Sequence, residues 1–127
     1  DPKRMGLGPA HAAGELLERN KLSPDDFDIF EINEAFSAQV LASLKALDDS
    51  RFCRQELGLA RKVGEIPMGK MNFNGGAIAL GHPLGATGAR LIISAARELW
   101  RRKKERALIA MCVSGGLGAG MILERVD

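Results

Sequence analysis

Three polar side chains stand where short apolar segments or glycine-rich loops end, and two of them, a histidine and a cysteine, could move a proton. His82 lies between Gly81 and Pro83, so its imidazole leaves a backbone that these two residues shape. Cys112 ends an apolar run just before a glycine-rich turn, where a thiol beside open backbone N–H groups can exchange a proton or stabilise an anion. Asn33 follows another short apolar segment. These residue types favour acid–base chemistry.

Each of the three also has a purely structural interpretation. A loop histidine can serve only as a hydrogen-bonding group, and a cysteine in a buried strand is usually a small hydrophobic residue. Asparagine is among the preferred residues at the N-cap of a helix, which would leave the amide of Asn33 with a structural role. Taken singly, the residues leave both interpretations open.

The periodicity of apolar residues predicts the elements that position these side chains. Helical spacing predicts helices over residues 9–20, 34–47 and 89–103, and a further one over 50–59 within a polar excursion at 48–66. Strand patterns occur at 27–32, 68–72, 107–113 and 119–126, and a glycine-rich turn over 114–118 pairs the last two antiparallel. We therefore expect an α/β fold with helices on the faces of a mixed, mostly parallel sheet. Ligands bind such sheets at the carboxyl ends of the strands.

The composition fits one globular domain over residues 1–127. Eighteen Lys and Arg oppose 16 Asp and Glu, the formal charge is +2 and 46% of the residues are hydrophobic, which excludes disordered, collagen-like and disulfide-scaffold classes. Cys53 and Cys112 lie too far apart in the sequence for a metal clip, so we expect no metal site and a reducing compartment. That compartment is the cytoplasm, or an organellar matrix in a eukaryote. No apolar run approaches the ~20 residues of a transmembrane helix.

Two further features concern the partners of the chain. It opens with Asp1-Pro2, with neither an initiator Met nor a signal sequence, so we expect a fragment of a longer protein. Residues 97–106 hold six basic side chains, but cations at the end of a helix complement its dipole. We therefore expect no nucleic-acid partner, and steeply salt-dependent DNA binding would contradict this.

Taken together, the motifs closely resemble the three C-terminal signatures of the thiolases, in the same order and at matching intervals. The residues that carry this resemblance are Asn33-Glu34-Ala35-Phe36, then Asn74-Gly75-Gly76-Ala77 leading to the segment Gly81 to Arg90, then Cys112 to Gly118. Residues 5–10 resemble the segment that follows the first strand of the thiolase C-terminal domain. The excursion around Asp49 to Phe52 looks like the long-chain, trifunctional-complex type of thiolase.

The resemblance implies a thiolase-like C-terminal half that lacks its first, central strand. Thiolases interconvert a 3-ketoacyl-CoA plus CoA with a shortened acyl-CoA plus acetyl-CoA. By resemblance, His82 activates the nucleophilic cysteine and donates to the thioester oxygen, and Cys112 is the second acid/base. Asn33 holds a water that completes the first oxyanion site, and the backbone N–H of Ser114 serves the second. Many relatives have glycine at this last position, so the Ser114 backbone must be able to adopt the required conformation.

The resemblance also implies partners and a limit on activity. Met5, Ala35 and Phe36 match positions that line the acyl and pantetheine end of the pocket, coenzyme A is a substrate, and no cofactor is permanently bound. The nucleophilic cysteine of the family lies in the N-terminal half, so we expect the 127-residue chain to be inactive alone. Expected partners are that half, further copies of the same subunit and a hydratase/dehydrogenase subunit.

Two alternatives remain at this point. In the first, the chain is a non-catalytic interaction domain of thiolase type, and His82 and Cys112 are inert. In the second, it belongs to the related condensing enzymes of ketoacyl synthesis. Those enzymes usually carry a second histidine where this chain has Cys112, which favours the thiolase interpretation.

Overall fold

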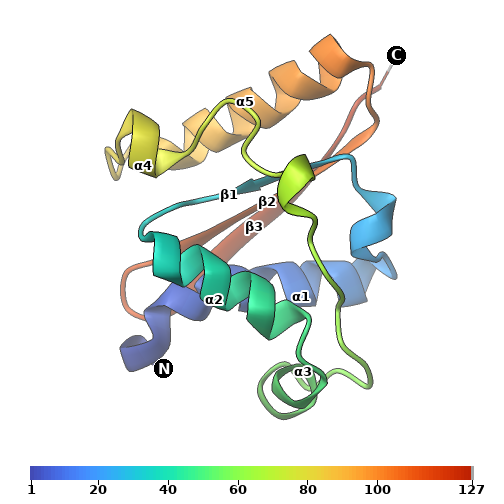
Figure 1. The fold of residues 1–127 in the computed structure, drawn as a ribbon, viewed down its shortest axis with the longest axis vertical. Helices are drawn as coiled ribbons and strands as arrows, with labels where there is room; N and C mark the ends of the chain where they lie inside the picture. Colours follow the sequence, from blue (N-terminus) through green and yellow to red (C-terminus); the bar gives the residue numbers. More distant parts are fainter. Residues whose placement is uncertain (127) are drawn as a thin grey trace.

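The computed structural model describes residues 1–126. It has three layers, with a small mixed sheet between two layers of helices (Figure 1). Its strands are β1 (Ile29–Ile32), β2 (Arg106–Val113) and β3 (Leu117–Glu124), in the order β1-β2-β3. β1 runs parallel to β2, with Ile32 opposite Ala110, and β3 runs antiparallel to β2, with Cys112 opposite Gly118. The expected α/β class and the antiparallel last strand are confirmed.

The helices cover both faces of this sheet. They are α1 (Gly8–Asn20), α2 (Ser37–Leu47), α3 (Ser50–Glu56), α4 (Ala77–Leu80) and α5 (Thr87–Arg102), with short 3-10 turns η1 (Pro2–Leu7), η2 (Pro24–Asp26) and η3 (Met68–Lys70). In Figure 1, α1 and α2 lie on one side of the strands and α5 on the other. Both the core periodicity of α5 and its predicted position are confirmed.

Each face of the sheet is covered by its own apolar core. On the first face, α1 and α2 pack over alternate strand residues such as Phe30, Leu108 and Ala110. On the second, α5 packs over the residues between them, such as Ile29 and Ile109. The strict alternation explains why the apolar runs of the strands are nearly continuous, because the sheet is buried on both sides.

One predicted strand is wrong. Residues 68–72 form η3 and a single parallel bridge from Met71 to Phe30 instead of a strand. Asn72 has a φ of 47°, a left-handed conformation that ends the extended backbone. Its side chain takes over the pairing, because its Oδ1 accepts from the N–H of Ile32 at 2.9 Å and its Nδ2 donates to the Ile32 carbonyl at 3.0 Å.

Without this strand, the sheet has fewer parallel strand pairs than expected. One parallel and one antiparallel pair remain, so the described sheet is mixed and not mostly parallel. β2 is central and is paired on both edges.

Two boundaries also differ from the expectation. The helix expected from residue 34 begins at Ser37, because residues 33–36 form an irregular link from β1, and β3 begins at Leu117, two residues earlier than expected. Gly115 and Gly116, at φ values of 88° and 86°, form the tight turn that allows this early start. No helix within residues 1–126 has the length and apolar character needed to cross a bilayer.

Candidate active site

Asn33 and His82 meet at the carboxyl end of β1. Asn33 follows directly on the strand, its side chain is fully buried, and its backbone N–H donates to the carbonyl of Ala110 at 2.9 Å, which extends the pairing with β2. Its Nδ2 lies 3.4 Å from Nε2 of His82, and its Oδ1 is buried without a hydrogen-bond partner among the described residues. The amide is therefore held in place and still has an acceptor to offer.

The hydrogen bonds of His82 determine which ring nitrogen is free to accept a proton. Its Nδ1 lies 2.7 Å from Oγ1 of Thr87, and this hydroxyl donates its one hydrogen to the carbonyl of Pro83 at 3.1 Å. Thr87 must then accept a hydrogen bond from Nδ1–H, which leaves the lone pair of the neutral ring on Nε2. That lone pair faces Asn33 across a long, weak contact, so it is available as a base.

The loop that carries His82 owes its shape to its neighbours. Gly81 ends α4 with a φ of 94°, which a residue with a side chain would adopt only under strain. The carbonyl of Pro83 then accepts from the N–H of Ala86 at 2.9 Å and of Thr87 at 3.0 Å, which starts α5. The imidazole is thus fixed between the end of one helix and the first residue of the next.

Glu34 holds the glycine-rich loop before α4 against β1. One carboxylate oxygen accepts from Nδ2 of Asn72 at 2.7 Å and the other from the N–H of Ile78 at 3.2 Å. Gly76 packs so close to this carboxylate that a Cβ there would clash with its atoms. A side chain at this position would therefore displace the Glu34 carboxylate from its hydrogen bonds to Asn72 and Ile78.

Cys112 lies at the same edge of the sheet, two residues beyond Ala110, and is half-buried. Burial raises the pKa of its thiol, which therefore keeps its proton at neutral pH and is a proton donor. By strand alternation, Cys112 leaves β2 on the face of Leu108 and Ala110, whereas Asn33 leaves β1 on the face of Ile29. Within residues 1–126, Cys112 has no hydrogen bond to His82 or Asn33. Strand alternation therefore places the thiol and the Asn33 side chain on opposite faces of the sheet, and a joint role of Cys112 and His82 in one site stays a prediction.

The other predicted site residues lie around this edge. Ser114 is exposed in the turn after β2 and does not have a positive φ, so its backbone N–H is presented without the strain that a left-handed conformation would impose. Phe36 is 66% exposed just before α2, Ala35 is half-buried beside it, and Met5 is 45% exposed in η1. η1 is held against α2, since Oγ of Ser43 donates to the carbonyl of Gly6 at 3.2 Å. Met5 and Phe36 therefore offer exposed apolar surface from neighbouring elements.

Sequence reasoning does not single out Thr87 or Asn72. A signal exists for each: Thr87 stands five residues after His82 at the start of a strongly periodic helix, and Asn72 precedes a glycine-rich segment and tolerates a positive φ. A surface cavity of about 290 Å³, lined by residues such as Arg4, His11 and Gly116, includes none of the predicted site residues.

Comparisons with known proteins find relatives along nearly the whole chain. The family model described as "Thiolase, C-terminal domain" matches residues 1–125. The mitochondrial trifunctional enzyme subunit beta of Bos taurus is 46% identical over 98% of the chain, and a 3-ketoacyl-CoA thiolase of Vibrio cholerae is 45% identical over 96% of it. The chain spans 26% and 28% of these two relatives.

Solved structures show the same relationship in three dimensions. Human mitochondrial 3-ketoacyl-CoA thiolase in complex with CoA superposes on all of the chain with a TM-score of 0.79 at 38% identity, and the match covers 28% of that structure. The acetyl-CoA acetyltransferase of Bacillus anthracis gives 0.77 at 42% identity over 98% of the chain and 27% of the structure. The chain therefore belongs to the thiolase family, to the part described as its C-terminal domain.

Proposed function

We propose that residues 1–127 are the C-terminal catalytic domain of a longer 3-ketoacyl-CoA thiolase. The observation that carries the proposal is the His82–Asn33 contact, in which a neutral imidazole turns an unprotonated Nε2 to the carboxyl edge of the sheet. The family membership supplies the reaction: a 3-ketoacyl-CoA and CoA give an acyl-CoA shortened by two carbons and acetyl-CoA, or the reverse.

In cleavage, His82 takes the proton of a cysteine contributed by the rest of the protein. The resulting thiolate adds to the 3-keto carbon, and the bond between C2 and C3 breaks to leave an acyl thioester on that cysteine and the carbanion of acetyl-CoA. Cys112 gives its proton to this carbanion, a role that suits a thiol whose pKa burial has raised. Cys112, now a thiolate, takes the proton of a second CoA, whose thiolate attacks the acyl thioester and releases the enzyme cysteine as a thiolate that His82 reprotonates.

The remaining residues stabilise charge and bind the substrate. The free Oδ1 of Asn33 holds the water of the first oxyanion site, and the backbone N–H of Ser114 serves the second. Met5, Ala35 and Phe36 line the acyl and pantetheine end with apolar surface. CoA acts as a substrate, and no resident cofactor enters these steps.

The proposal extends to partners and location. The N-terminal half of the protein completes the site, the subunits form a homo-oligomer, and a hydratase/dehydrogenase subunit is the further partner if the enzyme is of the trifunctional type. Similarity to a relative named as mitochondrial supports an organellar matrix in a eukaryote, and the cytoplasm is the location otherwise. The excursion around α3 favours the long-chain type.

One observation favours a second candidate, a non-catalytic thiolase-type domain. Cys112 makes no hydrogen bond to His82 or Asn33 within residues 1–126, as an inert strand cysteine would behave. The two candidates differ in what Cys112→Ser does to the full-length protein. A catalytic Cys112 predicts loss of carbon–carbon cleavage of about 10²- to 10⁴-fold, with acyl exchange between acyl-CoA and the enzyme cysteine retained.

The matched control for this experiment is Cys53→Ser. Cys53 is fully buried, and its Sγ contacts the carbonyl oxygens of Ala46 and Leu47, far from any predicted role in the reaction. Cys53→Ser should keep both half-reactions. Full cleavage activity in the Cys112 variant would reject the assignment, and cleavage by the purified 127-residue chain would reject the requirement for the missing half.

A further inference from the structure

Glu31 and the half-buried Arg90 lie near the site with charged groups that are buried, and the described residues give these groups neither a hydrogen bond nor an ion pair within 4 Å. Glu31 is on β1, is fully buried, and neither carboxylate oxygen has a partner among the described residues. Arg90 is on α5, and all three nitrogens of its guanidinium are buried and equally without a partner. Buried polar groups in native proteins are nearly always hydrogen-bonded, so a pair like this needs a reason.

The position of this pair relates it to the site. Glu31 precedes Asn33 by two residues on the same face of β1, which separates them by roughly 7 Å. Arg90 follows Thr87 by three residues on α5, where side chains three apart are neighbours on the helix surface. Asn33 and Thr87 are the two residues that hold His82, so Glu31 and Arg90 form the next layer beneath it.

The other carboxylates near Glu31, Glu34 and Glu98, have hydrogen-bonding partners of their own but still raise the pKa of Glu31. Glu34, from the end of β1, is hydrogen-bonded to Asn72 and to the N–H of Ile78. Glu98, from α5, is paired with Arg101 at 2.7 Å and Arg102 at 2.5 Å, and β2 presents the apolar Ile109 opposite Glu31. Arg90 is therefore the cation that attracts Glu31, and its attraction opposes the burial that raises the pKa of Glu31 to about 7.

Stability alone does not explain the pair. Two charges taken out of water regain the cost only with good geometry and saturated hydrogen bonds, which this pair lacks. Well-packed apolar side chains of similar volume are often as stable or more stable in such positions. A pair that contributes little to stability, kept directly beneath the His82 contact, is suited to setting the distance between β1 and the first turn of α5.

We propose that Glu31 and Arg90 are positioning residues for the His82–Asn33 contact of the proposed thiolase site. Their attraction holds the first turns of α5 against the end of β1, so that Nε2 of His82 stays in register with the amide of Asn33. The role rests on the proposed function, because it acts on the rate only if His82 does.

The test uses the full-length enzyme and the double variant Glu31→Leu with Arg90→Met, which replaces the pair with apolar side chains. The thermal midpoint should stay equal or rise, the KM should stay within about twofold, and kcat should fall about 10- to 100-fold, since small misplacements of a reacting group have effects of this size. Arg90→Lys keeps the charge and should retain more activity than Arg90→Met. A double variant with the kcat and KM of the wild type would overturn the proposal.

Two controls separate this result from other causes. Asp28→Asn, at the opposite end of the strand, should lower the thermal midpoint without changing kcat, which shows that lost stability alone does not reduce the rate. His82→Asn tests the proposed function itself: full activity in that variant would remove the function, whatever the pair does. Glu31→Gln, which keeps the volume of the side chain, should lower kcat in the same direction as the double variant, and wild-type kcat in it would also contradict the positioning role.

Discussion

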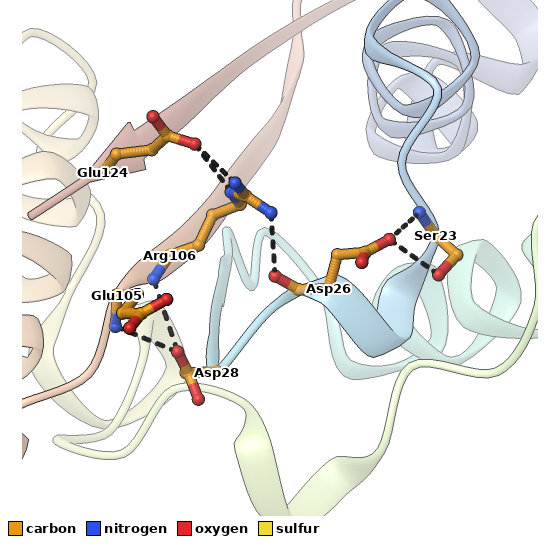
Figure 2. A network of polar contacts seen from close by, with 6 residues as sticks. All are labelled: Ser23, Asp26, Asp28, Glu105, Arg106 and Glu124. Carbon is orange, nitrogen blue, oxygen red and sulfur yellow. Dashed lines mark hydrogen bonds and ion pairs between the residues drawn. The ribbon is translucent and has the colours of Figure 1, made fainter.

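The polar side chains at the two ends of β1 differ in how fully they are hydrogen-bonded. At the start of the strand, Figure 2 shows a network in which Asp28 accepts from the N–H groups of Glu105 at 3.0 Å and Arg106 at 3.3 Å. Arg106 in turn donates to Glu124 at 2.8 Å. At the far end, the Oδ1 of Asn33 and both oxygens of Glu31 have no partner among residues 1–126.

The start of this four-residue strand therefore contributes to stability, whereas its carboxyl end carries the groups proposed to do chemistry. The hydrogen-bonded end ties η2, β1, β2 and β3 together. The carboxyl end keeps an unprotonated Nε2, an open amide oxygen and a buried charge pair, which have a cost in stability and are useful to a substrate. The open end is also the carboxyl end of the strand, where ligands bind in open α/β sheets.

The largest effect should come from removing the base at the open end. In the full-length protein, His82→Ala should lower kcat/KM for 3-ketoacyl-CoA cleavage by about 10²- to 10⁴-fold, because Nε2 is the group placed to accept the proton of the nucleophile. The thermal midpoint should change little. Steady-state kinetics and calorimetry measure both. The other histidine is the control: His11 makes an edge contact with Phe52 and is not one of the predicted site residues, so His11→Asn should be fully active.

The next effect is a pH dependence of opposite sign at two carboxyls. The pKa of Glu31 is raised to about 7 by burial, so the folded state holds a proton that the unfolded chain, with an ordinary value of 4.5, releases earlier. Its contribution to stability therefore falls as pH rises from about 4.5 to 7, by about 3 kcal/mol in the full-length protein. Glu98 has a pKa lowered to about 2 by its hydrogen bonds to Arg101 and Arg102, so its contribution is lost as pH falls from 4.5 towards 2.

Thermal midpoints across this pH range measure the first of these effects. The midpoint of the wild type relative to Glu31→Gln should decline between pH 4.5 and 7 and then level off, because the glutamine has no proton to lose. A constant difference between the two proteins over that range would show that Glu31 titrates normally and that its environment is not the one described.

A smaller effect on the rate should follow from removing the hydrogen bond that orients the imidazole of His82. Thr87→Val removes the hydroxyl that accepts from Nδ1–H of His82 while keeping the volume of this buried side chain. The ring is then free to change tautomer or turn, and kcat should fall about 10- to 100-fold with KM nearly unchanged. Thr87→Ser, which keeps the hydroxyl, should retain most of the activity, and equal rates in both variants would show that this bond does not orient the ring.

The sequence predicts the regular elements and the motif residues better than the contacts between them. α5 was expected within two residues of its observed start because its apolar stripe repeats over four turns, and Asn33 and His82 were identified as partners at one edge. The strand at 68–72 failed because nothing local reveals that the Asn72 side chain replaces the backbone in pairing with Ile32. The Glu31–Arg90 pair was equally hidden, since Glu31 stands in a strand pattern where it looks exposed.

The smallest expected effect lies at the hydrogen-bonded end and would complete the comparison. Asp28→Asn keeps the size of the side chain but loses the negative charge that accepts from two backbone N–H groups and pairs with Lys104 at 3.3 Å. Those hydrogen bonds, together with Lys104, keep the pKa of Asp28 low even though burial opposes them, so the carboxylate is charged at neutral pH. The full-length variant should lose about 1 to 2 kcal/mol of stability, as for other hydrogen bonds to a charged group, and keep its kcat. A fall in kcat as large as that of Thr87→Val would mean that strain spreads along β1, and the division between a stabilising end and a reactive end would not hold.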